Sequence, residues 1–235
     1  MTREEILRYK KQISLPAIGL EGQKKICSAK VLVIGAGGLG SPILLYLTAA
    51  GVGTIACMDF DCVEIHNLHR QVVHSEQSIG SYKVESASLR LRSLSSAVHY
   101  IPIPERATAA TVNDYISEYD IVVDGCDNFE TRYLINDACL SQQKPLVYGS
   151  ILNFELQMAV FNYQGSKDLR AIFPEPPHPD DVPSCDLNGV MGTTPGILGL
   201  MMAQETLKVI VGLPTLRNAW LIVDTLTWAI RKIRF

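Results

Sequence analysis

The sequence predicts an α/β protein with a mainly parallel sheet that continues into antiparallel strands in the C-terminal half. Three observations lead to this fold class. Short apolar segments alternate with segments of helical periodicity over residues 30–150, and a glycine-rich stretch directly follows the first of these apolar segments. After residue 150, strand-like segments with short turns predominate. An alternation of this kind is typical of parallel strands joined by right-handed helical crossovers.

Each element follows from the local pattern. Residues 2–13 and about 21–29 are predicted to be helices, the first with Ile6, Tyr9 and Ile13 at helical spacing. Apolar runs predict strands at 30–34, 54–59, 97–103, 120–124 and 146–150, with helices near 40–50, 83–95, 108–118 and 129–141. Further on, strands within 156–165 and 219–235, with a helix at 195–211 between them, are expected to extend the same sheet.

Composition excludes several classes of function. The formal net charge of −3 lacks the basic excess of a nucleic-acid-binding domain, so nucleic acid is not expected as a partner. The uncharged stretch Val31–Met58 is interrupted by glycines and a proline, which favours strand, turn and helix over a membrane span. Residues 1–13 carry charges but no apolar signal-peptide core, so a cytoplasmic location is expected.

The cysteines indicate a reducing compartment. They form no C-x-x-C pair and no compact framework, which argues against a disulfide scaffold and against a cysteine-rich zinc site. Any functional cysteine is therefore expected to act alone. The six positions are Cys27, Cys57, Cys62, Cys126, Cys139 and Cys185.

A glycine motif marks the first strand–helix junction. In the stretch VLVIGAGGLGSP, Gly35, Gly37 and Gly40 have the spacing G-x-G-x-x-G directly after an apolar strand. The first glycine allows a tight turn, the second lets phosphate approach the backbone, and the third lets the helix pack on the strand. With Gly38, these residues predict a nucleotide-binding loop in a Rossmann-like fold. Asp59, at the end of the next strand, lies where a carboxylate accepts hydrogen bonds from ribose hydroxyls.

The loop alone does not identify the nucleotide, because NAD-dependent and ATP-using enzymes share it. Beyond Asp59, the residues Asn67, Arg70, Gln71 and Lys83 add hydrogen-bond donors and two cations. A nicotinamide site needs mostly apolar walls, whereas a triphosphate needs cations and usually a metal ion. This cluster favours a triphosphate.

A second polar group follows a later predicted strand. The stretch YDIVVDGCDNFETRYLIND places Asp124 and Asp127 at the carboxyl end of that strand, where open α/β sheets bind their ligands. A carboxylate at this place can hold Mg²⁺, which neutralises phosphate charge. Arg132, in the following helix, either returns toward the same crevice or forms a surface salt bridge.

Taken together, these stretches resemble the ThiF/HesA/MoeB family of bacterial adenylyltransferases, which are related to ubiquitin-activating enzymes. The glycine motif is weak evidence by itself, but its ordered combination with N-L-x-R-Q and D-N-x-x-T-R is specific. The matching stretches are RYKKQI, GAGGLGSP, DFDCVEIHNLHRQ, KVESA, DGCDNFETR, PLVYGS, FPEPP and PSCDLNGVMGTTPGILG.

The resemblance implies a reaction and a division of the chain. The C-terminal carboxylate of a small ubiquitin-fold sulfur-carrier protein ending in Gly-Gly would attack ATP, giving an acyl adenylate and pyrophosphate, in thiamine or molybdopterin cofactor biosynthesis. Residues 1–235 would form a single domain with three parts. These are N-terminal helices over 1–29, a nucleotide-binding part over 30–150, and a carrier-binding antiparallel part over 151–235 with a crossover loop at 173–188.

The resemblance also assigns roles to residues of the matching motifs. In-line displacement at phosphorus requires positioning and charge stabilisation more than a protein nucleophile, so no Ser-His-Asp arrangement is needed. The implied roles are ribose binding for Asp59, phosphate contacts for Asn67, Arg70 and Lys83, Mg²⁺ binding for Asp127, nucleotide contacts for Gln71 and Asn128, and support of the site for Arg132.

Two further residues carry expectations from the resemblance. Members are typically homodimers in which a basic residue of the N-terminal helix reaches the partner's ATP site. The matching residue is Lys11, which keeps the charge but lacks the planar fork of the family's arginine, while Arg8 is expected to be structural. Cys185 matches a cysteine that joins covalently to the carrier or takes part in sulfur transfer in some members. A loop cysteine without a role is the alternative, and adenylation is not expected to need it.

The chain departs from the family pattern at two further places. Members commonly bind structural zinc through two C-x-x-C pairs, but Asp168 and Ala171 stand at the first pair and the chain ends at Phe235 before a second, so no structural zinc is expected. Leu156 stands where relatives usually have glycine, and it either changes the carrier-binding surface or fills a gap. These departures leave two alternatives: a non-catalytic member that binds nucleotide or carrier, and, from the glycine loop alone, an NAD-dependent oxidoreductase.

Overall fold

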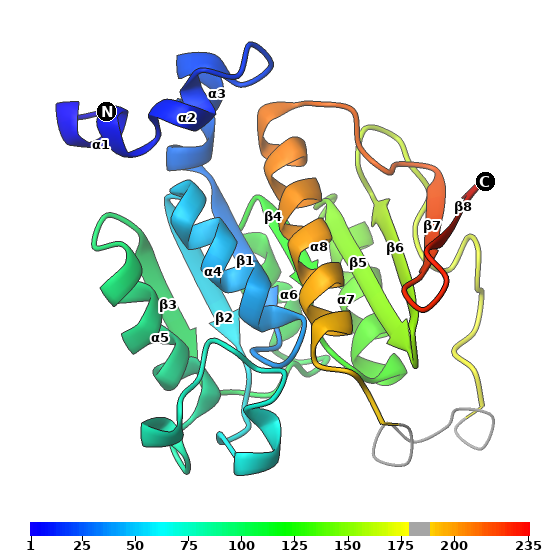
Figure 1. The fold of residues 1–235 in the computed structure, drawn as a ribbon. Coiled ribbons are helices and arrows are strands. Elements are labelled where there is room, and N and C mark those ends of the chain that lie inside the picture. Colours follow the sequence, from blue (N-terminus) through cyan, green and yellow to red (C-terminus); the bar gives the residue numbers. More distant parts are fainter. Residues whose placement is uncertain (179–188) are drawn as a thin grey trace.

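All the strands that the structure describes belong to one sheet, shown in Figure 1. The computed structural model describes residues 1–178 and 189–235. The sheet is 8-stranded, with the order β3-β2-β1-β4-β5-β6-β7-β8. The strands are β1 (Lys30–Ile34), β2 (Thr54–Met58), β3 (His99–Ile103), β4 (Ile121–Asp124), β5 (Leu146–Leu152), β6 (Glu155–Phe161), β7 (Ala219–Asp224) and β8 (Ala229–Arg234).

The sheet has a parallel half and an antiparallel half. Strands β1 to β5 pair in parallel, whereas β6, β7 and β8 each pair antiparallel with the strand before them. This arrangement confirms the predicted parallel sheet with an antiparallel extension. The chain reverses its order of strand addition between β1 and β4, so the crevice at their carboxyl ends is a topological switch point of the kind that binds ligands.

Helices cover both faces of the sheet (Figure 1). The alternation of side chains along β1 shows why: Val31 and Val33 join one apolar core, whereas Leu32 and Ile34 join the other. Helices α4, α5 and α8 contribute to the first core, and α6 and α7 to the second. These helices are α4 (Gly40–Ala50), α5 (Lys83–Leu94), α6 (Val112–Ser117), α7 (Phe129–Ser141) and α8 (Thr193–Val211).

The N-terminal segment consists of three short helices, α1 (Arg3–Arg8), α2 (Lys10–Ile13) and α3 (Gly19–Ser28). The expected single helix over 2–13 is therefore wrong, because the chain leaves helical geometry at Tyr9 and buries that side chain to 3% exposure. The Tyr9 ring lies so close to Gly51 that a Cβ there would come within 2.4 Å of it. Gln12 then donates to the Ala50 carbonyl at 3.1 Å, which fastens α2 to the end of α4.

Two other predicted elements are shorter in the structure. The helix expected at 108–118 begins only at Val112. The residues before it form a turn in which the Thr108 carbonyl accepts from the N–H groups of Thr111 and Val112. The third strand begins at His99. Within the described residues, no helix is both long enough and apolar enough to cross a membrane.

Candidate functional site

A cavity of about 910 Å³ lies at the switch point. The loops after β1, β2, β3 and β4 line it, together with the start of α5, the β5–β6 turn and residues before α8. Most of the residues singled out from the sequence meet here. The lining includes Gly35, Gly37, Gly38, Asp59, Arg70, Gln71, Lys83, Asp127, Asn128 and Arg132.

The glycine loop has the predicted geometry. Gly35 has φ of +102°, a conformation that favours glycine, and a Cβ there would lie 2.6 Å from the Gly125 carbonyl oxygen. A Cβ at Gly40 would lie 2.0 Å from the Gly35 carbonyl oxygen, so α4 can begin against the loop only because residue 40 lacks one. Gly40 therefore shapes the loop without itself lining the cavity.

The loop leaves backbone donors unused at the cavity. Gly37 and Gly38 line the cavity, as does Leu39, the residue before α4. Their backbone N–H groups donate no hydrogen bond to any residue that the structure describes. Adjacent N–H groups at the start of a helix form an anion-binding site, which the dipole of α4 reinforces.

Asp59 is tied to the glycine loop. Its carboxylate accepts from the N–H of Ala36 at 2.7 Å and from the N–H of Asp61 at 2.9 Å. Burial raises the pKa of Asp59, and the nearby charge of Lys83 partly offsets this effect. Each carboxylate oxygen has a second lone pair, so these bonds leave acceptor capacity toward the cavity.

Lys83 is a buried cation at the start of α5. Its ammonium group lies 2.7 Å from a carboxylate oxygen of Asp61, an exposed residue that follows Asp59 by two positions. This ion pair gives the buried ammonium group a carboxylate partner. Sequence reasoning missed Asp61, although its place beside Asp59 in the stretch DFD was a usable signal.

Arg70 and Gln71 present polar groups to the cavity. The Arg70 guanidinium donates to the His66 carbonyl at 3.0 Å and forms no ion pair with any described residue. The Oε1 atom of Gln71 is buried and has no hydrogen-bond partner among the described residues. Asn67, by contrast, does not line the cavity, because its side chain accepts from the Glu64 N–H at 3.1 Å in a 3-10 turn, Ile65–Asn67.

Arg132 lies buried beneath the loop after β4. It donates to the Cys126 carbonyl at 3.0 Å and to the Tyr148 hydroxyl at 3.0 Å. Asp124 is also buried, and its Oδ1 accepts from the Cys126 N–H at 3.0 Å. Both backbone polar groups of Cys126 are thus held. Arg132 itself lines the cavity, so of the two sequence alternatives the structure shows the return toward the crevice.

Asp127 and Asn128 stand next along this loop and are exposed at the cavity. The Asn128 side chain accepts from the Thr131 N–H at 2.9 Å and so caps α7. No cluster of three or more potential His, Cys, Asp or Glu metal ligands occurs among the described residues. Mg²⁺ is commonly held by one or two carboxylates together with substrate phosphates, and Asp127 fits that kind of site.

The remaining predicted residues lie elsewhere. Lys11 is exposed on α2 and is not part of this cavity. Arg8 donates to the Leu94 carbonyl, in agreement with a structural role. Leu156 is 1% exposed in the apolar core, so it fills internal space rather than forming surface. Cys185 lies outside the described residues.

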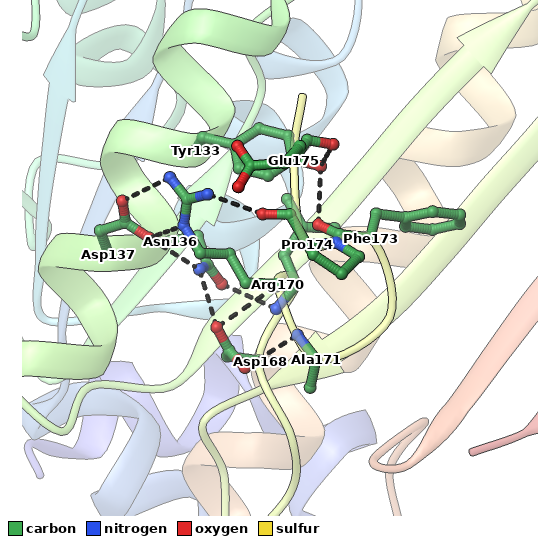
Figure 2. A network of polar contacts seen from close by, with 10 residues as sticks. Tyr133, Asn136, Asp137, Asp168, Arg170, Ala171, Phe173, Pro174 and Glu175 are labelled. Carbon is green, nitrogen blue, oxygen red and sulfur yellow. Dashed lines mark hydrogen bonds and ion pairs between the residues drawn. The ribbon is translucent and has the colours of Figure 1, made fainter. Parts of the chain in front are cut away.

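Asp168 and Ala171, where the family pattern has cysteines, lie in a separate polar network that joins α7 to the segment after β6 (Figure 2). The Asp168 carboxylate accepts from the Asn136 amide at 3.1 Å and from the N–H of Ala171 at 3.2 Å. Arg170 donates to both carboxylate oxygens of Asp137, at 2.7 and 2.9 Å. We call these residues, Asn136, Asp137, Asp168, Arg170 and Ala171, the α7 network.

Other lining residues had no clear sequence signal. Arg106, after β3, places its guanidinium 4.0 Å from the ring centre of Phe60, and both residues border the cavity beside Asp59. Glu105 lies next to them. Only the parallel pairing of β2 with β3 brings these residues together, which no local pattern reveals.

Comparison with known proteins agrees with the geometry. The ThiF family model matches residues 9–235. The chain is 44% identical over 235 residues to the adenylyltransferase and sulfurtransferase MOCS3 of Sus scrofa, covering 100% of this chain and 52% of that protein. It is 43% identical over 238 residues to the sulfur carrier protein adenylyltransferase of Thermus thermophilus, covering 99% of this chain and 88% of that protein. The chain thus spans about half the length of the MOCS3 relatives it matches.

Solved structures show the same fold at lower identity. E. coli MccB with MccA-N7isoASN superposes with a TM-score of 0.85 at 20% identity, covering 97% of this chain and 72% of that one. E. coli MccB with ATP superposes with a TM-score of 0.77 at 20% identity, covering 91% and 65%. The family model spans nearly the whole chain, and the Thermus relative is matched over most of its length. The chain belongs to the ThiF family.

Proposed function

We propose that this chain is an ATP-dependent adenylyltransferase that forms an acyl adenylate on the C-terminal Gly-Gly carboxylate of a small ubiquitin-like sulfur carrier and releases pyrophosphate. The observation that carries the proposal is the unused polar capacity of the switch-point cavity. Free N–H groups at Gly37, Gly38 and Leu39 face the same space as Arg70 and Lys83. The two named relatives, an adenylyltransferase and sulfurtransferase and a sulfur carrier protein adenylyltransferase, support this chemistry.

The step is an in-line displacement at the α-phosphorus of ATP. A carboxylate oxygen of the carrier forms the new P–O bond while the bond to the pyrophosphate oxygen breaks. The loop N–H groups and Arg70 would hold the phosphates in line, and Lys83 would stabilise charge on them. Asp59 would hold the ribose from its place beside the loop. None of these roles requires the protein to form a covalent bond to the substrate.

Mg²⁺ fits the residues present. The described lining contains more carboxylates than cations, so a triphosphate needs added positive charge: the acids are Asp59, Asp61, Glu105, Asp127 and Glu130, and the bases are Arg70, Lys83, Arg106 and Arg132. When bound, the ion supplies charge neutralisation at the phosphates. Asp127 would hold it, with Asn128 and the capped end of α7 fixing the position of that carboxylate.

The polar lining separates this proposal from hydride transfer. A nicotinamide ring needs an apolar wall and one proton-transfer group, whereas charged side chains surround the glycine loop here. ATP binding therefore explains the charged side chains of this cavity better than NAD binding does. We place the NAD-dependent alternative below the adenylyltransferase for this reason.

The carrier would approach along the antiparallel half. Ile151, Leu152 and Asn153, at the β5–β6 turn, line the cavity, so a peptide lying over this turn would bring its terminal carboxylate to the nucleotide. Exposed apolar side chains on the β7–β8 hairpin provide a surface of the kind that protein partners cover. They are Leu226, Trp228, Ile230 and Ile233.

A homodimer would complete the site. Lys11 is exposed on α2, which lies at the end of the molecule opposite to the carboxyl ends of the parallel strands (Figure 1). The cavity of its own chain lies at those carboxyl ends. Only a second copy could bring it to a nucleotide. Leu7 and Leu15, on the same segment, are exposed apolar residues that a partner subunit would cover.

The test is ATP–pyrophosphate exchange with Mg²⁺ in the presence and absence of candidate Gly-Gly-ended carriers. Exchange that depends on one carrier supports the proposed reaction and identifies the acceptor. ATP binding without exchange for any carrier would instead favour the non-catalytic alternative. It would also exclude the tested thiamine and molybdopterin carriers as substrates.

A further inference from the structure

Ala36 of the glycine loop is held through both of its backbone polar groups. The Ala36 N–H donates to Asp59, and the Ala36 carbonyl oxygen lies 2.9 Å from Nε2 of His74. A carbonyl oxygen can only accept, so Nε2 carries the proton. In the neutral ring Nδ1 is then an acceptor, and it lies 2.9 Å from the Ser86 hydroxyl, which donates to it. The position of His74 therefore depends on both partners.

These contacts belong to a closed polar ring. Ser86 lies in the first turn of α5, three residues after Lys83. Lys83 forms an ion pair with Asp61. The Asp61 N–H donates to the Asp59 carboxylate, which also accepts from the Ala36 N–H and so closes the ring. The ring thus joins the phosphate-facing loop before α4 to the cation at the start of α5. Two groups that would contact the same triphosphate are linked by direct contacts between side chains and backbone.

Burial keeps the ring in one protonation state. His74 is 8% exposed and Ser86 is 5% exposed. Burial lowers the pKa of His74, and the positive charge of Lys83 lowers it further. The imidazole is consequently neutral at physiological pH, which preserves the tautomer that the Ala36 carbonyl requires.

We propose that His74 is a positioning residue for nucleotide phosphates. It holds the Ala36 carbonyl, which shares a peptide group with the Gly37 N–H, and thereby orients the Gly37 and Gly38 N–H groups. This inference rests on the proposed nucleotide-binding function. His74 itself does not line the switch-point cavity, so its role would be indirect. It acts through Ala36, one residue before the first unused N–H group.

The experiment compares calorimetric titrations of Mg-ATP and of adenosine into the full chain and its variants. His74→Phe keeps the ring volume but removes both nitrogen contacts, and His74→Gln retains an amide donor near the position of Nε2. Losing a hydrogen bond of this kind should weaken ATP binding about tenfold in His74→Phe. Adenosine binding should stay within about twofold, because adenosine has no phosphate to position. His74→Gln should restore most of the ATP affinity.

Two matched serine variants control for a general loss of structure. Ser86 and Ser88 are buried serines of α5, 5% and 6% exposed, but only Ser86 contacts His74. We expect Ser86→Ala to weaken ATP binding about threefold and Ser88→Ala to leave it unchanged. If His74→Phe does not fold, this pair decides the inference.

The outcomes separate the two claims. If the unmodified chain binds no ATP, the proposed function fails and the inference falls with it. If the unmodified chain binds ATP but His74→Phe weakens ATP and adenosine equally, or Ser86→Ala and Ser88→Ala behave alike, the proposed function stands and His74 is merely structural.

Discussion

The switch-point cavity and the α7 network are both rich in charged side chains, but they use them differently. In the α7 network the polar groups bond to one another, as the two Arg170–Asp137 contacts and the three partners of Asp168 show (Figure 2). At the cavity, loop N–H groups and the Arg70 guanidinium have capacity that no described residue uses. Unused donors, rather than density of charge, therefore mark the candidate site.

Arg170 of the α7 network, together with the neighbouring Tyr133, fixes residues 168–175 against α7. Tyr133, on α7, places its hydroxyl 2.9 Å from the carbonyl oxygens of Phe173 and Glu175. Arg170 donates to the Pro174 carbonyl at 2.8 Å and lies over the Tyr133 ring. These contacts fasten the segment to α7 where the family pattern would place cysteines. Saturated polar contacts of this kind contribute stability, not ligand affinity.

The largest expected effect is at Asp127. Replacing Asp127 by asparagine keeps its shape but removes the charge that would hold Mg²⁺, so ATP–pyrophosphate exchange should fall by about a thousandfold or more. The unfolding temperature should change little. Asp114→Asn, at an exposed acid of α6, is the matched control and should leave exchange intact. Near-normal exchange in Asp127→Asn would remove the proposed metal ligand.

Arg70 should have the next largest effect. Arg70→Ala removes a cation that has no ion-pair partner among the described residues and should lower exchange about a hundredfold through weaker phosphate binding and positioning. Arg70→Lys should recover part of it, because charge is retained but the planar fork is lost. Arg92→Ala, on the exposed side of α5, controls for loss of surface charge. An unchanged rate in Arg70→Ala would mean that the phosphates lie elsewhere.

Much of the parallel half could be predicted because its signals are local. Apolar runs, helical periods and glycine spacing place β1, α4 and Asp59 with little help from the rest of the chain. The hydrogen-bond partners of buried polar groups could not be predicted from such local signals. Asn67 turns inward to cap its own turn, and His74 meets a carbonyl 38 residues earlier in the chain.

The α7 network was hidden for the same reason. The family resemblance implied only that Asp168 and Ala171 stand where relatives have cysteines. The partner amide of Asn136 lies 32 residues away and comes beside Asp168 only when α7 packs against the segment. Which polar groups find partners is decided by packing, so the contrast between a saturated region and an unsaturated one appears only in three dimensions.

Breaking the α7 network should affect stability but not nucleotide binding. Asp168→Ala removes the acceptor of the Ala171 N–H and leaves the Asn136 amide only its weaker contact with Asp137, which should lower the free energy of unfolding by about 1–3 kcal/mol. Urea unfolding measures this change, and calorimetric ATP titration should give an unchanged affinity. A loss of ATP affinity comparable to that of Arg70→Ala would show that the two regions are not separate in function.

The same region should give a small dependence on pH. Hydrogen bonds from Arg170 lower the pKa of Asp137 below its ordinary value of about 3.8. The stabilising contribution of this contact is therefore fully present above the unfolded-state pKa and is lost as the pH falls through the lower folded-state pKa. Urea unfolding at pH 6 should show Asp137→Asn to be less stable than the unmodified chain. The difference should shrink below about pH 4, and a difference that grows on acidification would contradict the assignment.

The smallest effect is expected at Cys185, which lies outside the described residues. The proposed step forms a bond between a carboxylate oxygen and phosphorus and needs no thiol. Cys185→Ser should leave acyl-adenylate formation unchanged, as measured by exchange and by direct detection of the adenylate. Loss of that step would mean that the thiol acts earlier than proposed.

The most direct test of the contrast between the two regions is amide hydrogen exchange by nuclear magnetic resonance, with and without saturating Mg-ATP. Unbonded amides exchange rapidly, and hydrogen bonding to a ligand slows them. We predict strong protection at Gly37, Gly38 and Leu39 on adding Mg-ATP, and no change at Arg170 and Ala171. Saturating binding without protection of the glycine-loop amides would show that the unused donors of the loop do not receive the triphosphate, and would contradict the account.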